Sequence, residues 1–112
     1  MIPTVTVSAD NNPDCSTNPG NATQDQVFLL SITEANKYFS SDNARQCKTT
    51  DYAVANGSWK SGSGYFFWWL RSPGGLQSSA AGVVSGGVVD EYGSRVNYDY
   101  SAVRPAMWIS LK

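Results

Sequence analysis

The sequence predicts an α+β fold in which two short helices precede a twisted antiparallel β meander. The chain has 112 residues, the length of one domain, and 41% of them are hydrophobic, which is enough for one core. Helix-capping residues gather between positions 31 and 57, and from position 59 onward short aromatic and valine runs are separated by Gly and Asn. These observations place the helices first and the sheet second.

The first 26 residues are expected to form a strand and a loop that pack on a domain spanning residues 27–112. Residues 3–7 read Pro-Thr-Val-Thr-Val, which favours a short strand. Residues 8–24 are turn formers almost throughout, which indicates a long ordered loop or a linker.

The first helix is predicted directly after an apolar run of strand length at residues 27–30. Ser31 and Glu34 have the spacing of a capping box, in which each residue's side chain accepts a hydrogen bond from the other's backbone. The apolar residues that follow share one helical face: Ile32, Ala35, Tyr38 and Phe39.

Further helix signals follow closely. Asp42 is a candidate cap for one additional turn, and Thr49 or Thr50 is expected to cap the second helix. Asn56 and Gly57 should end that helix, because glycine readily adopts the left-handed conformation found at helix C-termini.

The rest of the chain alternates strand formers with turn residues. The predicted strands span residues 65–70, 80–84, 88–89, 95–96, 102–103 and 107–109. Gly86-Gly87, Tyr92-Gly93 and residues 97–101 are the predicted connections. Six valines are expected to anchor the strands to the core: Val83, Val84, Val88, Val89, Val96 and Val103. A C-terminal strand at 107–111 should pair with an early strand and bring the two chain ends together.

Composition excludes several classes of function. The net charge is −1, and no run of Lys or Arg exceeds a single residue, so binding to a nucleic-acid backbone is not expected. The sequence has no His, which removes Ser-His-Asp and Cys-His catalysis and His-ligated zinc. No apolar stretch approaches the ~20 residues of a membrane span, and the first residues lack a signal-peptide pattern.

Residues 74–101 have the composition of an antibody paratope. Of these 28 residues six are Gly, five are Ser, three are Tyr and one is Asn. Tyr gives broad contact area at low entropic cost, and Ser, Gly and Asn give adaptable hydrogen bonds. Hairpin turns use the same small residues, but turn geometry does not explain Tyr92, Tyr98 and Tyr100.

Five consecutive aromatic residues, Tyr65 to Trp69, can serve the core or a sugar-stacking platform. In a strand about half of them point inward, which favours the core for most of them. Trp59 stands alone in a Gly/Ser loop and is the better candidate for an exposed aromatic residue.

The charged residues of this half suggest structural roles. Asp90, Glu91 and Asp99 could pair for glycoside hydrolysis or Ca²⁺ ligation, but their spacing matches no calcium loop, so no catalytic residue, metal or cofactor is expected. Arg71 and Arg104 adjoin apolar runs and precede Ser-Pro or Pro. This context favours buried arginines that donate to backbone carbonyls or a carboxylate.

Cys15 and Cys47 are the only two thiols. They are either bridged, which would tie the N-terminal loop to the helical half, or two unrelated buried thiols. We expect a bridge in an oxidising compartment, where it would stabilise the fold by roughly 3–4 kcal/mol.

Three segments, residues 27–39, 68–74 and 102–109, resemble a bacterial and phage domain family that carries W-W-L-R-S-P-G and V-R-P-A-L-W-I signatures in this order. The resemblance covers roughly residues 21–112. That family is similar to C-type lectin folds of the formylglycine-generating-enzyme type, and some members resemble the variable proteins of diversity-generating retroelements.

The resemblance implies a division between scaffold and ligand-facing positions. The scaffold positions are Trp68, Trp69, Leu70, Arg71, Pro73, Val103, Arg104, Pro105, Trp108 and Ile109. The ligand-facing positions are Leu76, Gln77, Ser78, Ser79, Asp90, Glu91, Tyr92, Ser94, Arg95, Asn97, Tyr98, Asp99, Tyr100 and Ser101. The calcium–sugar motifs of animal C-type lectins are absent, as are the metal and cysteine pair of the formylglycine-generating enzyme, so neither activity carries over.

We therefore expect a non-enzymatic display module that binds a protein or glycan ligand. The resemblance implies that the module is part of a larger extracellular, cell-surface or phage-particle protein, with loops 75–79, 90–95 and 97–101 on one ligand-binding face. Two alternatives remain: a carbohydrate-binding or carbohydrate-active domain, and a structural module of a large surface protein.

Overall fold

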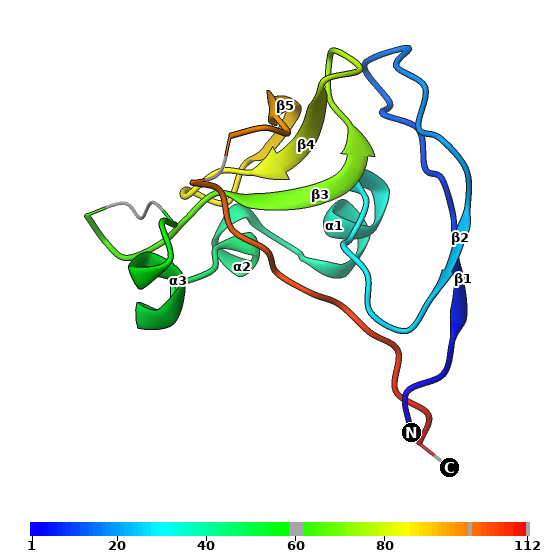
Figure 1. Ribbon diagram of the computed structural model, residues 1–112, viewed down its shortest axis with the longest axis horizontal. Helices are drawn as coiled ribbons and strands as arrows, with labels where there is room; N and C mark the ends of the chain where they lie inside the picture. The colour runs from blue at the N-terminus through cyan, green and yellow to red at the C-terminus, as the bar shows by residue number, and fades with distance from the viewer. Residues whose placement is uncertain (59–61, 99, 112) are drawn as a thin grey trace.

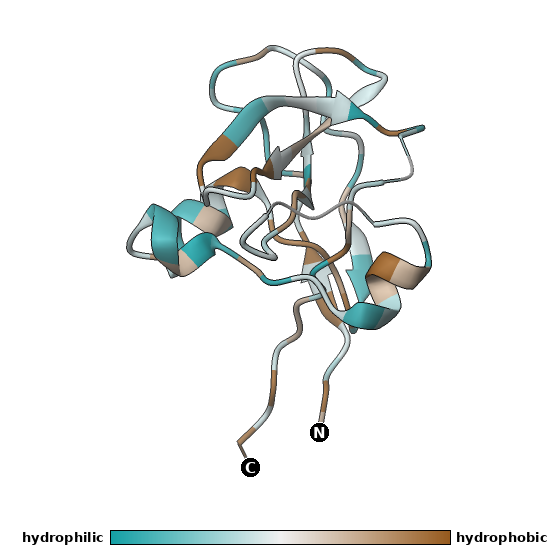
Figure 2. Ribbon diagram, turned by 90° about the vertical axis from the view of Figure 1, so that its left-hand side faces the viewer, coloured by the Kyte–Doolittle hydropathy of each residue, from teal (hydrophilic) through white to brown (hydrophobic). Residues whose placement is uncertain are grey.

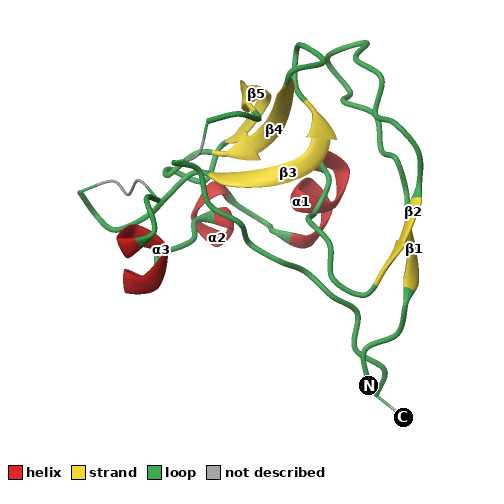
Figure 3. Cartoon of the chain, in the orientation of Figure 1, coloured by secondary structure: helices red, strands yellow, loops and turns green. Residues whose placement is uncertain are grey.

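The computed structural model describes residues 1–58, 62–98 and 100–111, and its architecture is α+β (Figure 1). In chain order the elements are β1 (Val5–Val7), β2 (Thr23–Asp25), α1 (Ile32–Tyr38), α2 (Asp42–Arg45), α3 (Asp51–Ala55), β3 (Trp68–Pro73), β4 (Ser79–Val83) and β5 (Val89–Arg95). Strands β1 and β2 form an antiparallel pair, and β3, β4 and β5 form an antiparallel sheet in that order. Figure 3 shows the helices together on one side of this sheet, below β3 in this view.

The predicted capping box of α1 is confirmed. Ser31 Oγ accepts a hydrogen bond from the Glu34 amide at 3.2 Å, and Glu34 Oε1 accepts one from the Ser31 amide at 3.0 Å. Thr50 caps α3 by accepting from the Ala53 amide, and Gly57, at φ 101°, follows the end of that helix. Local hydrogen bonding of this kind depends on sequence neighbours alone, which is why spacing predicted it.

The single turn α2 is capped by Ser41 and not by Asp42. Ser41 Oγ accepts a hydrogen bond from the Ala44 amide, while Asp42 is the first helical residue and forms an ion pair with Arg45. Serine and aspartate are both good N-cap residues, so the sequence alone left the start of α2 uncertain by one residue, between Ser41 and Asp42.

The core lies between α1 and one face of the three-stranded sheet. Side chains on β3 alternate, with Trp68, Leu70 and Ser72 buried toward α1 and their neighbours half-buried on the other, outer face. The buried cluster consists of Ile32, Ala35, Phe66, Trp68, Leu70, Ala81, Val83 and Ala102. The prediction that about half of the aromatic run points inward is therefore confirmed.

Three of the six predicted anchor valines are exposed: Val88, Val96 and Val103. Val83 is fully buried, and Val89 packs against the core cluster from β5. Successive residues of a strand point to opposite faces, so Val88, which precedes Val89, points away from the core. Val96 and Val103 lie outside the named strands, where no neighbouring element covers them.

The C-terminal segment is extended but is not a strand, which corrects the prediction for residues 107–109. It makes one antiparallel bridge, between Ala106 and Phe28, and the Ser110 amide donates to the Met1 carbonyl at 3.0 Å. The expectation that the two chain ends lie together is confirmed (Figure 1). Trp108 and Ile109 were expected in the scaffold, yet they are 49% and 63% exposed, because no layer of the fold covers this segment.

The N-terminal loop packs on the end of the sheet through side-chain bonds to backbone carbonyls. Asn12 is buried and donates through Nδ2 to the carbonyls of Pro73 and Glu91, at 2.9 and 2.7 Å. Thr17 Oγ1 donates to the Gly74 carbonyl at 2.7 Å. These contacts tie residues 12–17 to the β3–β4 turn and to β5.

Arg71 joins three segments, as its sequence context indicated. Its guanidinium donates to the backbone carbonyls of Ser8 and Leu29 and forms ion pairs with Asp10 and Glu34. Ser31 Oγ also donates to Asp10 Oδ2, so the carboxylate of Asp10 links the loop to the start of α1. Arg104 has a similar role, with its guanidinium over the rings of Phe39 and Trp68.

This network predicts a loss of stability in acid. Burial alone raises the pKa of Asp10, but hydrogen bonds from Ser31 and Ser8 and the charge of Arg71 outweigh burial and lower the pKa. A carboxyl with a lowered folded-state pKa stabilises the fold above its unfolded pKa of about 3.9, and this stabilisation is lost as pH falls through the folded pKa. We expect urea unfolding at a series of pH values to show a higher free energy of unfolding for the wild type than for Asp10→Asn near neutral pH. This difference should shrink toward zero as the pH falls below about 3.9.

Asp14→Asn is the control for this prediction, because Asp14 is an exposed carboxylate in the same loop. Its difference from the wild type should stay small at every pH. If the Asp10→Asn difference were constant with pH, Asp10 would contribute no charged interaction to the fold.

Cys15 and Cys47 are free thiols in the structure, so the predicted bridge is not formed. Cys15 belongs to the N-terminal loop at the end of the sheet, whereas Cys47 packs against the core cluster near the start of β3. A spacing of 32 residues allowed a bridge, but in the fold Cys15 lies among residues of the N-terminal loop and Cys47 packs against the core cluster.

None of the helices described here has the length and apolarity needed to cross a bilayer.

Candidate functional site

The connection after β5 runs across the outer face of the sheet. The Val96 amide donates to the Ser78 carbonyl beside β4, and Ala102 exchanges hydrogen bonds with Phe67 and Trp69 on the far edge of β3. Residues 96–98 and 100–102, the crossing segment, therefore lie with one end beside β4 and β5 and the other beside β3. Figure 1 shows these residues in orange.

A groove of about 440 Å³ lies between the crossing segment and the outer face. Its lining residues come from the residue before β3, the β4–β5 turn, β5 and the crossing segment. They are Phe67, Val84, Ser85, Ser94, Tyr100 and Ser101. This volume lies in the range of small-ligand pockets, about 300–1,000 Å³. The described lining residues are two aromatic rings, one valine and three serines, so the groove offers apolar contact together with hydroxyl groups for hydrogen bonding.

Gly82 leaves space for the ring of Phe67 above the sheet. A Cβ added to Gly82 would meet the Phe67 ring at 2.1 Å, so the ring occupies the space above the Gly82 backbone. Trp69 packs edge-on against Phe67 with ring centroids 5.3 Å apart. Two aromatic side chains thus lie on the outer face, opposite the core residues Trp68 and Leu70.

Tyr98 and Tyr100 form a stacked pair on the crossing segment. Their ring centroids lie 5.5 Å apart with an interplanar angle of 24°, and both rings are exposed. The pair extends the aromatic surface of the groove toward solvent. Rings of this kind supply contact area at little entropic cost, because each has only two side-chain torsions.

Tyr92 lies on a bulge in β5 and not in the predicted turn. Ala80 pairs with Ser94 and Gly82 with Asp90, so three residues of β5 stand opposite the single residue Ala81. Gly93 has φ 72° inside this bulge. The extra residues project Tyr92 into solvent, where it is 72% exposed, and its ring lies over Gly75.

Several predicted ligand-facing residues have structural contacts instead. Asp90 Oδ1 accepts from the Gly93 amide within the bulge, the Glu91 carbonyl is held by Asn12, and Gln77 Oε1 accepts from the Asn18 amide. Residues 90–95 belong to strand β5, which corrects the prediction of a loop there. Asp90 and Gln77 thus make structural contacts through their side chains, and Glu91 does so through its backbone carbonyl.

The predicted set thus divides into distinct places. Ser94, Tyr100 and Ser101 line the groove, and Tyr98 stacks beside it. Ser79 and Arg95 pair at the ends of β4 and β5, while Leu76, Ser78 and Asn97 are exposed nearby. Asp99 and Trp59 lie outside the described residues.

Sequence reasoning missed half of the groove: Phe67, Val84 and Ser85. Phe67 belongs to the aromatic run that was weighed as core or sugar-stacking platform, and strand alternation is the signal that could have placed it opposite Trp68. Val84 was expected in the core, and Ser85 was not singled out. Only the path of the crossing segment makes these residues part of one surface.

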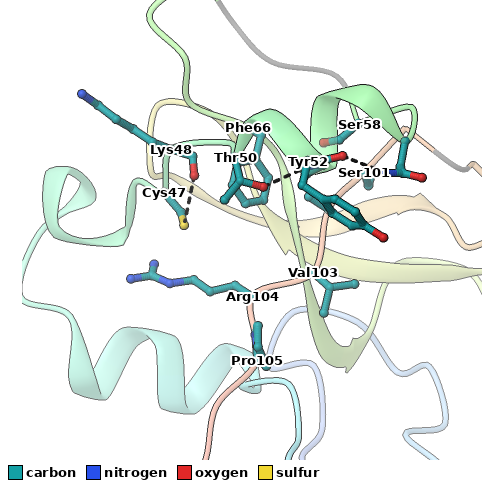
Figure 4. Close-up of a pocket in the computed structure, with 13 residues that line it drawn as sticks. Cys47, Lys48, Thr50, Tyr52, Ser58, Phe66, Ser101, Val103, Arg104 and Pro105 are labelled. Atoms are coloured by element: carbon teal, nitrogen blue, oxygen red, sulfur yellow. Dashed lines mark hydrogen bonds between the residues drawn. The ribbon is translucent and has the colours of Figure 1, made fainter.

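A second cavity of about 410 Å³ lies on the other side of residues 101–105, against α3 (Figure 4). Phe66, Tyr52 and Val103 give it apolar walls. In Figure 4 the side chains of Lys48 and Arg104 extend to one side, away from Tyr52, so their charges do not converge on a bound group. Ser101 is the only predicted ligand-facing residue among its lining residues.

Comparison with known proteins gives one match. A family model described as a domain of unknown function (DUF6273) matches residues 1–111, which is nearly the whole chain. No curated protein and no solved structure matches the chain.

Proposed function

Since the chain belongs to the family described as a domain of unknown function (DUF6273), we propose its function from the groove: the domain is a non-enzymatic module that binds a ligand on the outer face of its sheet. The observation that carries the proposal is the groove between Phe67 and Tyr100, lined by aromatic rings and serine hydroxyls, with the exposed Tyr98–Tyr100 pair beside it. Concave sites lined by aromatic rings with a few hydroxyls are the usual form of small binding sites.

The position of the groove supports a display role. Tyr98 and Tyr100 lie on a connection outside the named strands, and Tyr92 lies on a bulge. Replacing side chains at such positions disturbs few backbone hydrogen bonds, so the surface can change while the core persists. This is the property that the resemblance to variable proteins of diversity-generating retroelements requires.

The proposal extends to fold and setting. A C-type-lectin-like arrangement is supported by the order of helices before the meander and by chain ends that lie together. Its setting would be a bacterial cell-surface or phage protein outside the cell, with this chain as the binding module of a larger polypeptide.

A carbohydrate ligand is the second candidate, and the lining of the groove favours it. Sugar rings pack their C–H faces on aromatic rings and take hydrogen bonds from hydroxyl groups. Phe67 and Tyr100 supply the rings, and Ser85, Ser94 and Ser101 supply the hydroxyls. A peptide side chain with a ring and a hydroxyl satisfies the same lining.

Two probes separate these ligands: a glycan array and a phage-displayed random peptide library, each applied to the folded chain. The best binder from either is then titrated against Tyr98→Ala/Tyr100→Ala by interferometry. We expect the double substitution to weaken binding by roughly 100-fold, since tyrosines that a ligand buries on binding typically contribute over 1 kcal/mol each. Thermal stability should change little, because both rings are exposed.

Tyr52→Ala is the matched control, because Tyr52 is also an exposed tyrosine but lines the second cavity. It should leave the affinity unchanged. Full affinity in the double variant, or an equal loss in the control, would place binding elsewhere on the domain.

A further inference from the structure

The single turn α2 adds no buried side chain to the core. Three of its four residues, Asp42, Asn43 and Arg45, are polar, and none of the four is buried. Figure 2 shows hydrophilic residues of this kind, in teal, on the short helices. A helix of one turn has little stability of its own. Its place in the fold therefore depends on the polar contacts that it makes with the sheet.

Two side chains at the end of α2 hold the turn between β4 and β5. Arg45 Nε donates to the Gly87 carbonyl at 2.8 Å, and Gln46 Nε2 donates to the Ser85 carbonyl at 3.2 Å. The Gly87 amide closes the turn by donating to the Val84 carbonyl at 2.8 Å. Residues 84–87 are thus held from α2 as well as by their own hydrogen bond.

The turn also lies directly against the backbone of α2. A Cβ at Gly87 would meet the Asp42 carbonyl oxygen at 1.8 Å, whereas a Cβ at the neighbouring Gly86 would meet nothing within 4 Å. Gly87 is buried although it belongs to a turn. The turn is therefore seated on α2 at this one residue.

The backbone of Arg45 connects α2 to the core and to the chain that follows the opposite wall of the groove. Its carbonyl accepts hydrogen bonds from Trp68 Nε1 at 3.1 Å and from Arg104 Nη1 at 3.2 Å. Trp68 is fully buried in the core. Arg104 follows Tyr100 and Ser101, which line the groove, by only a few residues. Both walls of the groove are thus fixed relative to Arg45.

We infer that Arg45 and Gln46 are positioning residues of the groove. They hold the wall that carries Val84 and Ser85 on α2, and so fix its separation from the wall formed by the crossing segment. Neither side chain lines the groove, so their influence on a ligand passes through the turn. The inference rests on the proposed function, because it concerns the fit of a ligand in the same groove. Walls that are already held in place bind a ligand without the cost of ordering them.

Two substitutions release the turn from α2 with little change in side-chain size. Gln46→Met keeps the length of the side chain and removes the donor to the Ser85 carbonyl. Arg45→Lys keeps a positive charge beside Asp42 and removes the Nε donor to the Gly87 carbonyl.

Amide hydrogen exchange, followed by NMR, measures the positioning without a ligand. In both variants we expect the amides of Val84 and Gly87 to exchange roughly 5-fold faster than in the wild type, because one hydrogen bond that holds the turn is lost. The Trp69 amide donates to the Ala102 carbonyl at the edge of β3 and should exchange at the wild-type rate.

The affinity of the groove is measured with two probes that combine a ring with hydroxyl groups, p-cresol and methyl β-glucopyranoside. Each is titrated into the folded chain, and the NMR shifts of the Ser85 and Ser94 amides report binding in the groove. We expect both variants to raise the dissociation constant by about 5-fold for each probe that binds the wild type.

Gln24→Met is the matched control, because Gln24 Nε2 also donates one hydrogen bond, to Thr6 Oγ1 at 2.8 Å, but within the β1–β2 pair. It should leave the exchange rates of the turn and the affinity for the probes unchanged. Equal effects in the control and in the two α2 variants would contradict the inference.

Two results overturn the inference alone: wild-type exchange rates in the turn of both variants, or faster exchange with unchanged affinity for a probe that binds. A wild-type groove that takes up neither probe at tens of millimolar overturns the proposed function, and the inference with it.

Discussion

Trp68→Ala should remove most of the stability of this domain, about 3–5 kcal/mol of the free energy of unfolding. Trp68 is fully buried at the centre of the core, and Nε1 donates to the Arg45 carbonyl at 3.1 Å. Phe39 packs edge-on against its ring, and the Arg104 guanidinium lies 4.9 Å from its centroid. Truncation would leave a cavity among these groups and would remove one of the two side-chain hydrogen bonds that the Arg45 carbonyl accepts, the other coming from Arg104.

Urea unfolding followed by circular dichroism measures the loss. Because the alanine variant risks not folding, Trp68→Phe provides a second point, with an expected loss of about 2 kcal/mol from the smaller cavity and the missing hydrogen bond. Trp108→Ala is the control, because Trp108 is half exposed on the C-terminal segment that follows the sheet. A Trp108 substitution as costly as Trp68→Ala would contradict this account of the core.

Gly93→Ala should destabilise the domain by roughly 3 kcal/mol, from a left-handed backbone and a steric clash together. Gly93 has φ 72°, a conformation that costs an L residue energy. A Cβ at this position would meet the Ala80 carbonyl oxygen at 1.8 Å, and that oxygen belongs to the neighbouring strand. The bulge could accept the methyl group only by moving β5 away from β4.

Gly20→Ala separates the two causes. Gly20 has a similar φ of 82°, but a Cβ there would meet nothing within 4 Å. It should therefore show the backbone cost alone, about 1 kcal/mol. If thermal or urea unfolding gave equal losses for the two variants, the close packing of β5 against Ala80 would be wrong.

The elements that the sequence predicted well depend on neighbours a few residues apart. The capping box of Ser31 and Glu34 formed as expected because both hydrogen bonds stay within one helical turn. Period-two alternation correctly predicted that about half of the aromatic run points inward, although Trp69, which was expected in the scaffold with Trp68, is only half-buried on the other face. The structural role of Arg71 was also predictable from its context: it is half-buried, and its guanidinium donates to backbone carbonyls and pairs with carboxylates.

The elements that it missed depend on residues distant in the chain. Val103, Trp108 and Ile109 are apolar, but hydrophobicity states only a preference for burial, and no element of the described fold covers them. The cysteine pair illustrates the same limit. The spacing of the two cysteines permits a bridge, but tertiary packing places Cys15 in the N-terminal loop and Cys47 against the core, and both thiols are free.

The sequence by itself determined the α+β class, the capped starts of α1 and α3 and the tyrosine-rich connection. Only the tertiary structure decided which aromatic residues point inward, and that residues 96–98 and 100–102 lie with Phe67 and Val84 around a groove on the outer face. It also decided that β5 bulges at Gly93 and projects Tyr92. These features arise from strand register and from backbone contacts between segments far apart in the chain, and local propensity carries no information about either.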